Sequence, residues 1–455
     1  MSSFPYHIKE HTVPGQHVRE WARATANSQE DVLNIHVKQY IPKDNPSPQP
    51  GDVTILGAHA NGFPKELYEA LWEDLHTRSK AHGFRIRGIW IADVSNQGWS
   101  AQINEDKLGN DPCWHDHSRD LLHLTNVFRA EMPRPIVGVG HSFGANILTH
   151  LSLLHPRLLT TLVLLDPTII IFDPARNSGP GSSPARASTF RRETWPSRQV
   201  AIESFQRSPF YRSWDPRVLK AWTENSIRKL PTLLFPELPS DSDSSPKANP
   251  ASPSGSGSTD PGVTLRTPKH QEVFTFFRPL WPYITAEPPA SSPPHTIAKS
   301  GVPDYDVNES SPLNPGPTPY AFYRSEGGLV LKALPAVRPS ALFVHGSTSE
   351  ISPPHIRDLR VSTCGIGPGG SGGVAAGRVA EVVMEGKGHL FPMEYPDESA
   401  AHAARWIGTE LARWREEEAE YESWTKLPVR EKTTMSEEFM DRVGRPKPRP
   451  KKSKL

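Results

Sequence analysis

Short apolar runs that alternate with helical patterns are the strongest structural signal in this 455-residue chain. Residues 53–58 form one continuous apolar run, and leucines at helical spacing follow within residues 64–80. A run of this kind is typical of a strand that is covered on both faces. Further apolar runs occupy residues 84–92, 135–140 and 161–165. Strands separated by helices predict a parallel sheet, because a parallel pair needs a long crossover between its members.

The same reasoning predicts the remaining strands and helices. Residues 31–41 alternate apolar and polar side chains, as a half-buried strand requires. Helices are predicted at 114–131 and 143–154, and the pattern resumes late in the chain with strands at 341–345 and 379–384 and a closing helix at about 397–417. We therefore expect an α/β fold with one mostly parallel central sheet that is flanked by helices.

Between these two stretches, the periodic patterns largely disappear from about residue 168 to residue 338. Helical pieces remain near 198–205 and 216–227, but Ser, Pro and Gly dominate much of the rest. A structureless loop of this length is uncommon inside a compact core, so we predict a cap, partly helical and partly disordered, inserted between two strands of the sheet. The predicted segments are a first core part at 1–167, the cap at 168–338, a second core part at 339–425 and a basic tail at 426–455.

Charge and cysteine content exclude several classes of protein. The formal net charge is +1, from 51 basic and 50 acidic residues, so no overall field favours nucleic acid or an anionic membrane. Cys113 and Cys364 lie far apart and neither belongs to a CxxC pair, which argues against a disulfide framework and a thiolate zinc site. No apolar stretch is long enough to span a bilayer, and the N-terminal segment lacks a signal-peptide core. We expect neither a membrane span nor secretion.

The last three residues, Ser453, Lys454 and Leu455, form a peroxisomal targeting signal when they stand at a free carboxyl terminus. A basic, proline-containing run precedes them and favours an exposed tail. The sequence therefore predicts the peroxisomal matrix as the location and the peroxisomal import receptor as a partner. A homodimer is also compatible with the sequence.

The motif Gly-His-Ser-Phe-Gly at residues 140–144 lies between a predicted strand and a predicted helix. In this context G-x-S-x-G is typical of a nucleophile elbow, in which the serine stands on a sharp turn above the end of a sheet. The glycines let the backbone turn without a Cβ that would clash. The motif therefore predicts an α/β-hydrolase fold, with Ser142 as the nucleophile.

A serine hydroxyl needs a general base, which in this fold lies on a loop after the last strand. His389 directly follows the last predicted strand and is the candidate. Two carboxylates are candidates for the acid that orients this imidazole: Asp166 ends the strand at 161–165, and Glu350 follows the strand at 341–345. From the residues alone, Asp166 and Glu350 are nearly equal candidates for this acid.

Two backbone N–H groups are needed to hold the oxyanion of an acyl-transfer intermediate. Phe143, the residue after the nucleophile, supplies one of them. The other is expected from the loop after the strand at 53–58, where Gly62 permits a tight turn. Asn61 is the predicted donor in that loop, and Ala60 is the alternative. This chemistry needs no metal and no redox cofactor.

Several long strings, most of them outside the cap, are peculiar to one group of proteins. They are DVLNIHVKQYIPK, FPKELYEALWEDL, WHDHSRDLL, MPRPIVGVGHSFGANI, HPRLLTTLVLLDP, WPSRQVAI, GIGPGGSGGV with GRVAEVV, and the SKL ending. In these strings the chain resembles a fungal family of peroxisomal α/β hydrolases of secondary metabolism, which includes acyl-CoA hydrolases and host-selective toxin biosynthesis hydrolases. The resemblance implies hydrolysis of an acyl-CoA thioester, and it implies Asp166 as the acid, because the family's aspartate lies in the LLDP segment. The chain departs from the family in the oxyanion loop, where His-Ala-Asn-Gly replaces a His-Gly beginning.

The residues and the resemblance together predict a serine hydrolase with Ser142, Asp166 and His389 as its triad, acting on the acyl-CoA of a secondary metabolite. The alternatives are a carboxylesterase or lactonase whose substrate lacks CoA, and a catalytically silent binding protein of the same fold. Guanidinium groups pair well with phosphate oxygens, so cap arginines are candidates for contacts to CoA, with a solvated surface as the alternative. These arginines are Arg191, Arg192, Arg198, Arg207 and Arg212.

Overall fold

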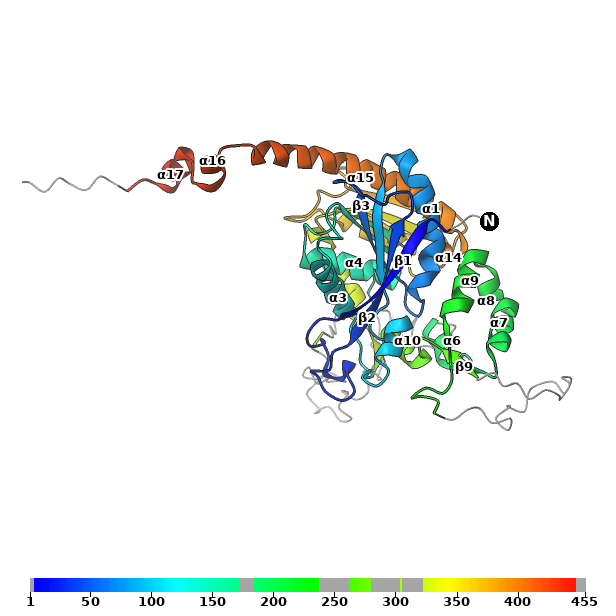
Figure 1. The fold of residues 1–455 in the computed structure, drawn as a ribbon. Helices are drawn as coiled ribbons and strands as arrows, with labels where there is room; N and C mark the ends of the chain where they lie inside the picture. Colours follow the sequence, from blue (N-terminus) through cyan, green and yellow to red (C-terminus); the bar gives the residue numbers. More distant parts are fainter. Residues whose placement is uncertain (1–3, 172–183, 237–261, 280–302, 305–321, 447–455) are drawn as a thin grey trace, which may run out of the picture.

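The computed structural model describes residues 4–171, 184–236, 262–279, 303–304 and 322–446. Its centre is an eight-stranded sheet of order β1-β2-β4-β3-β5-β6-β12-β13 (Figure 1). β2 pairs antiparallel with β1 and with β4, and all the other neighbouring pairs are parallel. The prediction of a mostly parallel sheet is confirmed. The strands are β1 (Tyr6–Pro14), β2 (Asn34–Pro42), β3 (Val53–Ala58), β4 (Ile86–Ala92), β5 (Ile136–His141), β6 (Thr161–Leu165), β12 (Ser340–Gly346) and β13 (Val379–Met384).

β1 is the one strand of this sheet that the sequence did not reveal. It lies at the edge of the sheet, and most of its side chains are exposed, with Tyr6 and Val13 as its buried residues. Without a buried face, an edge strand lacks the apolar alternation on which prediction depends. β2 begins three residues later than predicted and β4 two residues later, whereas the other strands begin and end within one residue of the predicted bounds.

Helices cover both faces of the sheet (Figure 1). One hydrophobic cluster joins the sheet to α3, α4 and α12, and a second joins it to α1, α15 and part of the cap segment. α12 falls within the segment predicted as the cap, yet it packs against α4. The helices are α1 (Glu69–Ser79), α2 (Gly98–Ile103), α3 (Trp114–Val127), α4 (Phe143–Leu154), α12 (Glu326–Ala333), α13 (Pro354–Thr363), α14 (Phe391–Glu394) and α15 (Pro396–Thr425).

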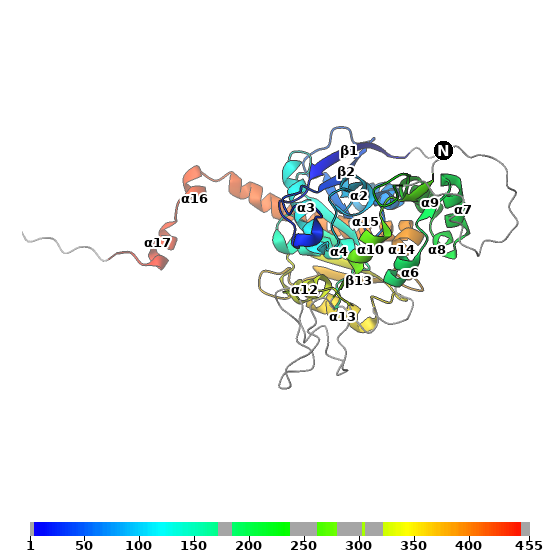
Figure 2. The same ribbon diagram turned by 90° about the horizontal axis from the view of Figure 1, so that it is seen from below.

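The segment predicted as the cap contains a small sheet of order β7-β9-β8 and several short helices (Figure 2). Its elements are α6 (Pro184–Phe190), β7 (Thr194–Trp195), α7 (Arg198–Arg207), α8 (Pro209–Arg212), α9 (Pro216–Asn225), β8 (Ile227–Lys229), β9 (Val263–Leu265), α10 (Lys269–Phe276), β10 (Arg278–Pro279) and β11 (Phe322–Tyr323). α7 and α9 coincide with the two predicted helical pieces. The low-complexity stretches at 173–184, 238–262 and 287–319 lie largely outside the described residues, and the division of the chain into four segments stays a prediction.

Aromatic and charged contacts join this cap segment to the core. The ring of Phe63, in the loop after β3, stands edge-on to Trp214 and Trp222 with centroid distances of 5.4 and 6.4 Å. Arg217 of α9 donates two hydrogen bonds to the carboxylate of Asp74 in α1, at 3.0 and 2.8 Å. The cap segment is therefore held over the loop that follows β3.

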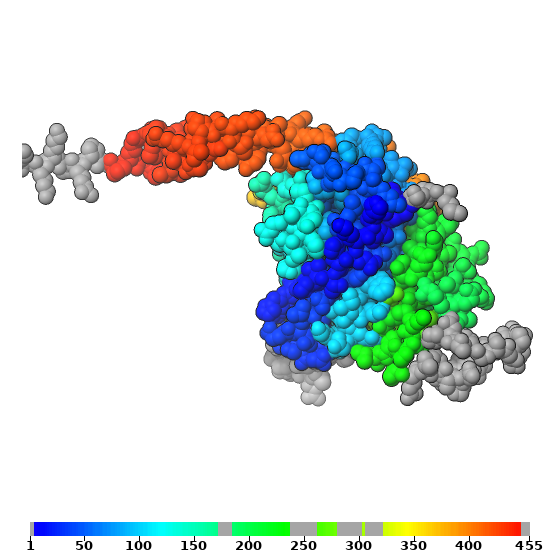
Figure 3. All heavy atoms as spheres, viewed as in Figure 1, coloured from blue at the N-terminus to red at the C-terminus, as the bar shows by residue number. Residues whose placement is uncertain are grey.

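The C-terminal helices lead away from the body of the molecule (Figures 1 and 3). The buried residues of α15 end at Leu411, and α16 (Val429–Thr433) and α17 (Glu437–Val443) contain none. The targeting tripeptide at 453–455 lies outside the described residues. Among the described helices, none combines the length and the apolar character needed to cross a membrane.

Candidate active site

Ser142 stands at a sharp bend between β5 and α4, at the carboxyl end of a central strand. Its φ of 56° and ψ of −117° are rare for an L-residue and place the side chain at the apex of the bend. A Cβ on Gly140 would come within 2.7 Å of the Gly144 carbonyl oxygen, and one on Gly144 within 2.2 Å of the Ala58 carbonyl oxygen. Glycine is therefore required at both motif positions, because the space holds no side chain.

His389 lies in the loop between β13 and α14 and contacts two of the other predicted site residues. Its Nε2 is 2.9 Å from Oγ of Ser142, and its Nδ1 is 2.5 Å from Oδ2 of Asp166. In the neutral imidazole, Nδ1–H donates to the carboxylate, which leaves Nε2 to accept the serine proton. Glu350, the alternative acid, is exposed in the turn after β12. The structure therefore brings Asp166, and not Glu350, to the imidazole.

Asp166 is fully buried just beyond β6, with φ at 40°. The hydroxyl of Ser349 donates to its Oδ2 at 2.5 Å, and the N–H of Gly346 approaches its Oδ1 at 3.4 Å. Burial alone would raise the pKa of this carboxyl, but the hydrogen bond and charge of His389 and the hydroxyl of Ser349 outweigh burial and hold the pKa well below its usual range. The carboxylate therefore stays ionised, as the support of an imidazolium requires.

Thr168 touches the candidate nucleophile, and sequence reasoning missed it. Its Oγ1 lies 3.0 Å from Oγ of Ser142, and its N–H donates to the Ser142 carbonyl at 3.0 Å. When the serine O–H donates to His389, the threonine hydroxyl is free to donate to the serine oxygen. No motif spacing marks this threonine, although it stands only two residues after Asp166.

The loop after β3 carries three consecutive N–H groups, two of which already have partners. Ala60 donates to the hydroxyl of Tyr68 at 2.8 Å, and Gly62 donates to Oε1 of Gln97 at 2.7 Å. For the N–H of Asn61, no partner is recorded among the described residues. The N–H of Phe143 belongs to the first turn of α4, where backbone donors have no acceptor within the helix. Asn61, rather than Ala60, is therefore the candidate second donor for an oxyanion.

Gln97 holds this loop from both sides. Its Oε1 accepts from Gly62, and its Nε2 donates to Oδ1 of Asn61 at 2.8 Å. The Asn61 amide also donates to the backbone carbonyl of Glu272, in α10, at 3.1 Å. Gln97 is fully buried at the start of α2, so one amide orients the loop and the loop in turn contacts the cap segment.

A second chain of hydrogen bonds passes through His141, the residue before Ser142. Nε2 of His141 lies 3.0 Å from the backbone carbonyl of His389, and its Nδ1 lies 2.9 Å from the hydroxyl of Tyr68. Burial, followed by the charge of His389, lowers the pKa of His141 to about 3, so its ring is neutral. Nε2–H then donates to the carbonyl and Nδ1 accepts from Tyr68, which itself accepts from Ala60. This chain connects the loop after β3 with the backbone of His389.

The predicted phosphate-binding arginines of the cap have different surroundings. Arg191 lies 2.5 Å from a carboxylate oxygen of Glu272, so its charge is already balanced. Arg207 is exposed and pairs with Glu203 at 2.9 Å. Arg198 donates only to backbone carbonyls at the end of α9 among its described contacts. Arg192 and Arg212 are exposed.

Comparison with known proteins identifies the family of the chain. A family model described as "Alpha/beta hydrolase family" matches residues 55–402. The chain belongs to the alpha/beta hydrolase family. One solved alpha/beta hydrolase, the "Peroxisomal alpha-beta-hydrolase Lpx1 (Yor084w) from Saccharomyces cerevisiae", aligns with a TM-score of 0.62 and 14% identity, over 97% of this chain and 94% of that one. At this identity the likeness shows the fold alone.

The curated relatives that match this chain include proteins of two fungi. The "Type I acyl-CoA thioesterase mpaH'" of Penicillium brevicompactum is 41% identical over 423 residues, which cover 92% of each chain. The "Abhydrolase domain-containing protein AFT2-1" of Alternaria alternata is 29% identical over 280 residues, which cover 61% of this chain and 84% of that protein. The predicted fold and the predicted family are confirmed, and this member of the alpha/beta hydrolase family is an enzyme of the hydrolase class.

Proposed function

We propose that this chain is a serine hydrolase that cleaves the thioester of an acyl-CoA and releases the carboxylic acid. The observation that carries the proposal is the position of His389, whose ring nitrogens lie 2.9 Å from the Ser142 hydroxyl and 2.5 Å from the Asp166 carboxylate. Contacts of this length on both nitrogens meet the requirement for a nucleophile, a base and an acid that act together.

In the proposed reaction, His389 removes the proton of Ser142 while the serine oxygen attacks the thioester carbonyl carbon. Asp166 keeps the imidazole oriented and stabilises its positive charge. The N–H groups of Asn61 and Phe143 hold the oxyanion. The C–S bond then breaks, CoA leaves as the thiol with the proton from His389, and an acyl ester remains on the serine. A water molecule that gives its proton to His389 hydrolyses this ester, which yields the carboxylic acid and regenerates Ser142.

The 41% identical relative is named an acyl-CoA thioesterase, and the match covers 92% of both chains and therefore extends beyond the core, which supports a thioester as the substrate class. The same catalytic groups would also open an oxygen ester or a lactone. A secondary metabolite is the proposed acyl group, in line with the fungal family that the sequence resembles.

Labelling with a fluorophosphonate tests the nucleophile. We expect the folded protein to be labelled on Ser142, and the Ser142→Ala variant to stay unlabelled. Ser152→Ala is the matched control, because it removes another buried serine hydroxyl, in α4, whose hydrogen bond goes to the Thr149 carbonyl and not to the triad. A folded wild-type protein that resists the reagent would favour a silent binding protein.

Turnover of paired substrates tests the bond that is cleaved. A panel of acyl-CoAs is compared with the methyl esters of the same acids, with thiol release or acid formation as the readout. We expect kcat/KM to be higher for at least one acyl-CoA than for its methyl ester. Faster turnover of every methyl ester would instead assign the chain to the carboxylesterases.

The location is proposed on the tripeptide Ser453, Lys454 and Leu455, through which the peroxisomal import receptor would bind. A fluorescent protein fused to the N-terminus leaves this tripeptide free. We expect punctate fluorescence that coincides with a peroxisomal marker, and diffuse fluorescence when Leu455 is deleted. Diffuse fluorescence of the intact fusion would contradict the proposal.

A further inference from the structure

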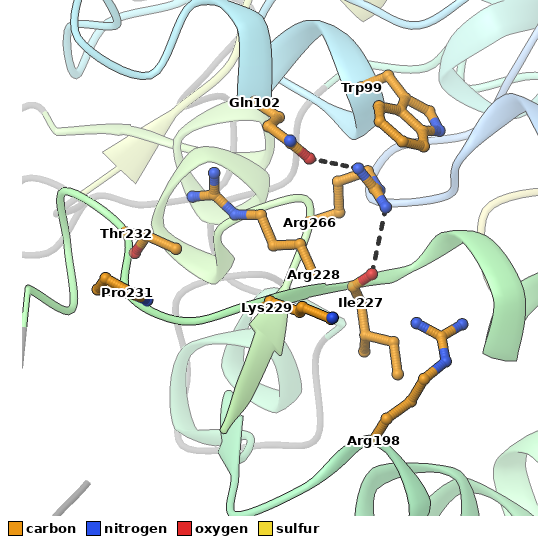
Figure 4. A pocket seen from close by; sticks show the side chains of 9 residues that line it. All are labelled: Trp99, Gln102, Arg198, Ile227, Arg228, Lys229, Pro231, Thr232 and Arg266. Carbon is orange, nitrogen blue, oxygen red and sulfur yellow. Dashed lines mark hydrogen bonds between the residues drawn. The ribbon is translucent and has the colours of Figure 1, made fainter. Parts of the chain in front are cut away.

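A cavity of about 360 Å³ opens between α2 and the cap elements α7, β8 and β9, and no triad residue lines it (Figure 4). Four of its lining residues are cationic, namely Arg198, Arg228, Lys229 and Arg266, and none of the lining residues is acidic. A concave site with several cations and no acid in its wall attracts anions, because the surrounding protein screens charge less than water does.

The positive charge of this cavity is only partly balanced. Arg228 forms an ion pair with Glu105, in which two nitrogens lie 2.9 and 2.5 Å from the two carboxylate oxygens. Arg198 donates to the carbonyls of Thr223 and Glu224, at 2.6 and 3.0 Å, and a carbonyl leaves its charge in place. Lys229 is exposed at the cavity, and no ion pair is recorded for it among the described residues.

Arg266 forms the rigid inner wall. Its guanidinium stacks on Trp99 at 3.5 Å from the ring centroid and donates to Gln102 and to the carbonyls of Asn225 and Ile227. All of these acceptors are neutral. Burial lowers the pKa of Arg266 to about 10; the charges of Glu66 and Asp93 oppose this shift, and those of Arg228 and Arg198 add to it. The arginine remains charged at neutral pH and is fixed in place before any ligand arrives.

The cavity shares its structural support with the candidate oxyanion loop. Trp99 and Arg266 form part of the cavity wall. The residue before Trp99, Gly98, donates its N–H to the hydroxyl of Thr267, the residue after Arg266, at 2.8 Å. Gln97, one residue further back, holds Asn61. Residues 97–99 therefore contact both the candidate oxyanion loop and the wall of the cavity.

We propose that this cavity receives the phosphate groups of the CoA portion of the substrate. The inference rests on the proposed thioesterase function and adds the part of the molecule that holds the substrate's charged end. Fixed guanidinium groups suit phosphate oxygens, and Lys229 adds a mobile point charge at the rim. The acyl group and its thioester then lie at Ser142, joined to the phosphates by the uncharged pantetheine arm.

Binding and turnover of Lys229→Glu test this proposal. We expect the Kd for CoA, measured by calorimetry on the full chain, and the KM for an acyl-CoA to rise roughly five-fold to twenty-fold, with kcat unchanged. The KM for the matching acyl-pantetheine thioester, which lacks the nucleotide, should not change. Lys229→Gln should give a smaller rise, because it removes one positive charge without adding a negative one.

Lys220→Glu is the matched control, since Lys220 is an exposed lysine of α9 whose side chain is 74% exposed and does not line the cavity. The same rise in KM in both Glu variants would overturn the proposal, as would an unchanged Kd for CoA in Lys229→Glu. Adenosine 3′,5′-bisphosphate should compete with CoA in wild type, and inorganic phosphate should compete far more weakly. Equal competition by inorganic phosphate would mean a general anion site and would also overturn it.

These outcomes are separable from the proposed function. If the protein hydrolyses neither the acyl-CoA nor the acyl-pantetheine thioester, while CoA still binds in a manner sensitive to Lys229→Glu, the function fails and the phosphate site stands. If both thioesters are hydrolysed, and every variant has the same KM as wild type for each of them, the function stands and the phosphate site fails.

Discussion

Nε2 of His141 donates to the backbone carbonyl of His389 at 3.0 Å, so the residue beside the candidate nucleophile holds the backbone of the candidate base. The two residues are far apart in sequence and come from the elbow and from the loop after β13. The other nitrogen of His141 accepts from Tyr68, which also receives the N–H of Ala60. One buried, neutral ring therefore couples the position of the base to the position of the oxyanion loop.

Replacing His141 by Phe should lower kcat by about ten-fold to a hundred-fold, because two buried hydrogen bonds are lost and the His389 loop can shift. Tyr68→Phe removes the hydrogen bonds to His141 and to Ala60 but keeps the bond from His141 to the His389 carbonyl, so it should lower kcat less. If the chain of hydrogen bonds acts as a unit, the double variant should raise the activation free energy by less than the sum of the increases in the two single variants. Additive increases in activation free energy, calculated from kcat, would show that the two links act independently.

Replacing Asp166 by Asn should lower kcat by about 10⁴-fold with the fold retained, because the amide favours the wrong tautomer of His389. Glu350→Gln, the matched exchange in the exposed turn after β12, should leave kcat within about two-fold. Turnover of one activated ester, with circular dichroism to check folding, compares the two variants. A large loss in Glu350→Gln together with a small loss in Asp166→Asn would reverse the assignment of the acid.

Replacing Gln97 by Ala should lower kcat by about ten-fold to a hundred-fold, because the loop that presents the Asn61 N–H loses its clamp and the Gly62 N–H loses its acceptor. Asn61→Ala keeps the backbone N–H and removes only the side-chain contacts, so its effect should be smaller. Kinetics of both variants, with thermal melts as a check on folding, measure the difference. Equal losses would mean that the Asn61 side chain, and not the clamp, orients the loop.

The free energy of unfolding should fall as the pH drops below about 6.5, because buried histidines stay neutral in the folded protein. Burial, with the charge of His115, lowers the pKa of His150 from 6.5 to about 3, and the two rings stack with centroids 3.6 Å apart. The unfolded chain binds a proton near the usual pKa, which the folded chain does not, so this one group should remove about 2 kcal/mol between about pH 7.5 and about pH 5.

His150→Phe isolates this contribution, since phenylalanine keeps an aromatic ring in the stack and cannot titrate. Chemical denaturation at about pH 7.5 and about pH 5 should show a loss of stability that is about 2 kcal/mol smaller in the variant than in wild type. The same loss in both proteins would show that His150 does not contribute to the pH dependence.

Much of the fold could be predicted because its signals are local. The parallel strands β3, β5, β6 and β12 contain short continuous apolar runs and are buried along their whole length, and such a run can be recognised from neighbouring residues alone. β1 escaped prediction because its pairing with β2, rather than burial of its own side chains, makes it a strand. α12 was assigned to the cap because its sequence neighbours are Pro- and Ser-rich, whereas its packing on α4 depends on contacts that are distant in sequence.

The sequence by itself determined the bend at Ser142 and the choice of His389, because a glycine-bounded turn between strand and helix and the first histidine after the last strand are both set by neighbouring residues. Reasoning from the residues alone left Asp166 and Glu350 open, the resemblance favoured Asp166, and the tertiary structure places Asp166, and not Glu350, against the ring of His389. Both acids follow strands that lie side by side in the sheet, β6 and β12, and the outcome depends on which side chain points inward. The loop after β12 turns Ser349 toward Asp166 and leaves Glu350 in solvent, and that orientation arises from packing across the sheet, which no spacing along the chain records.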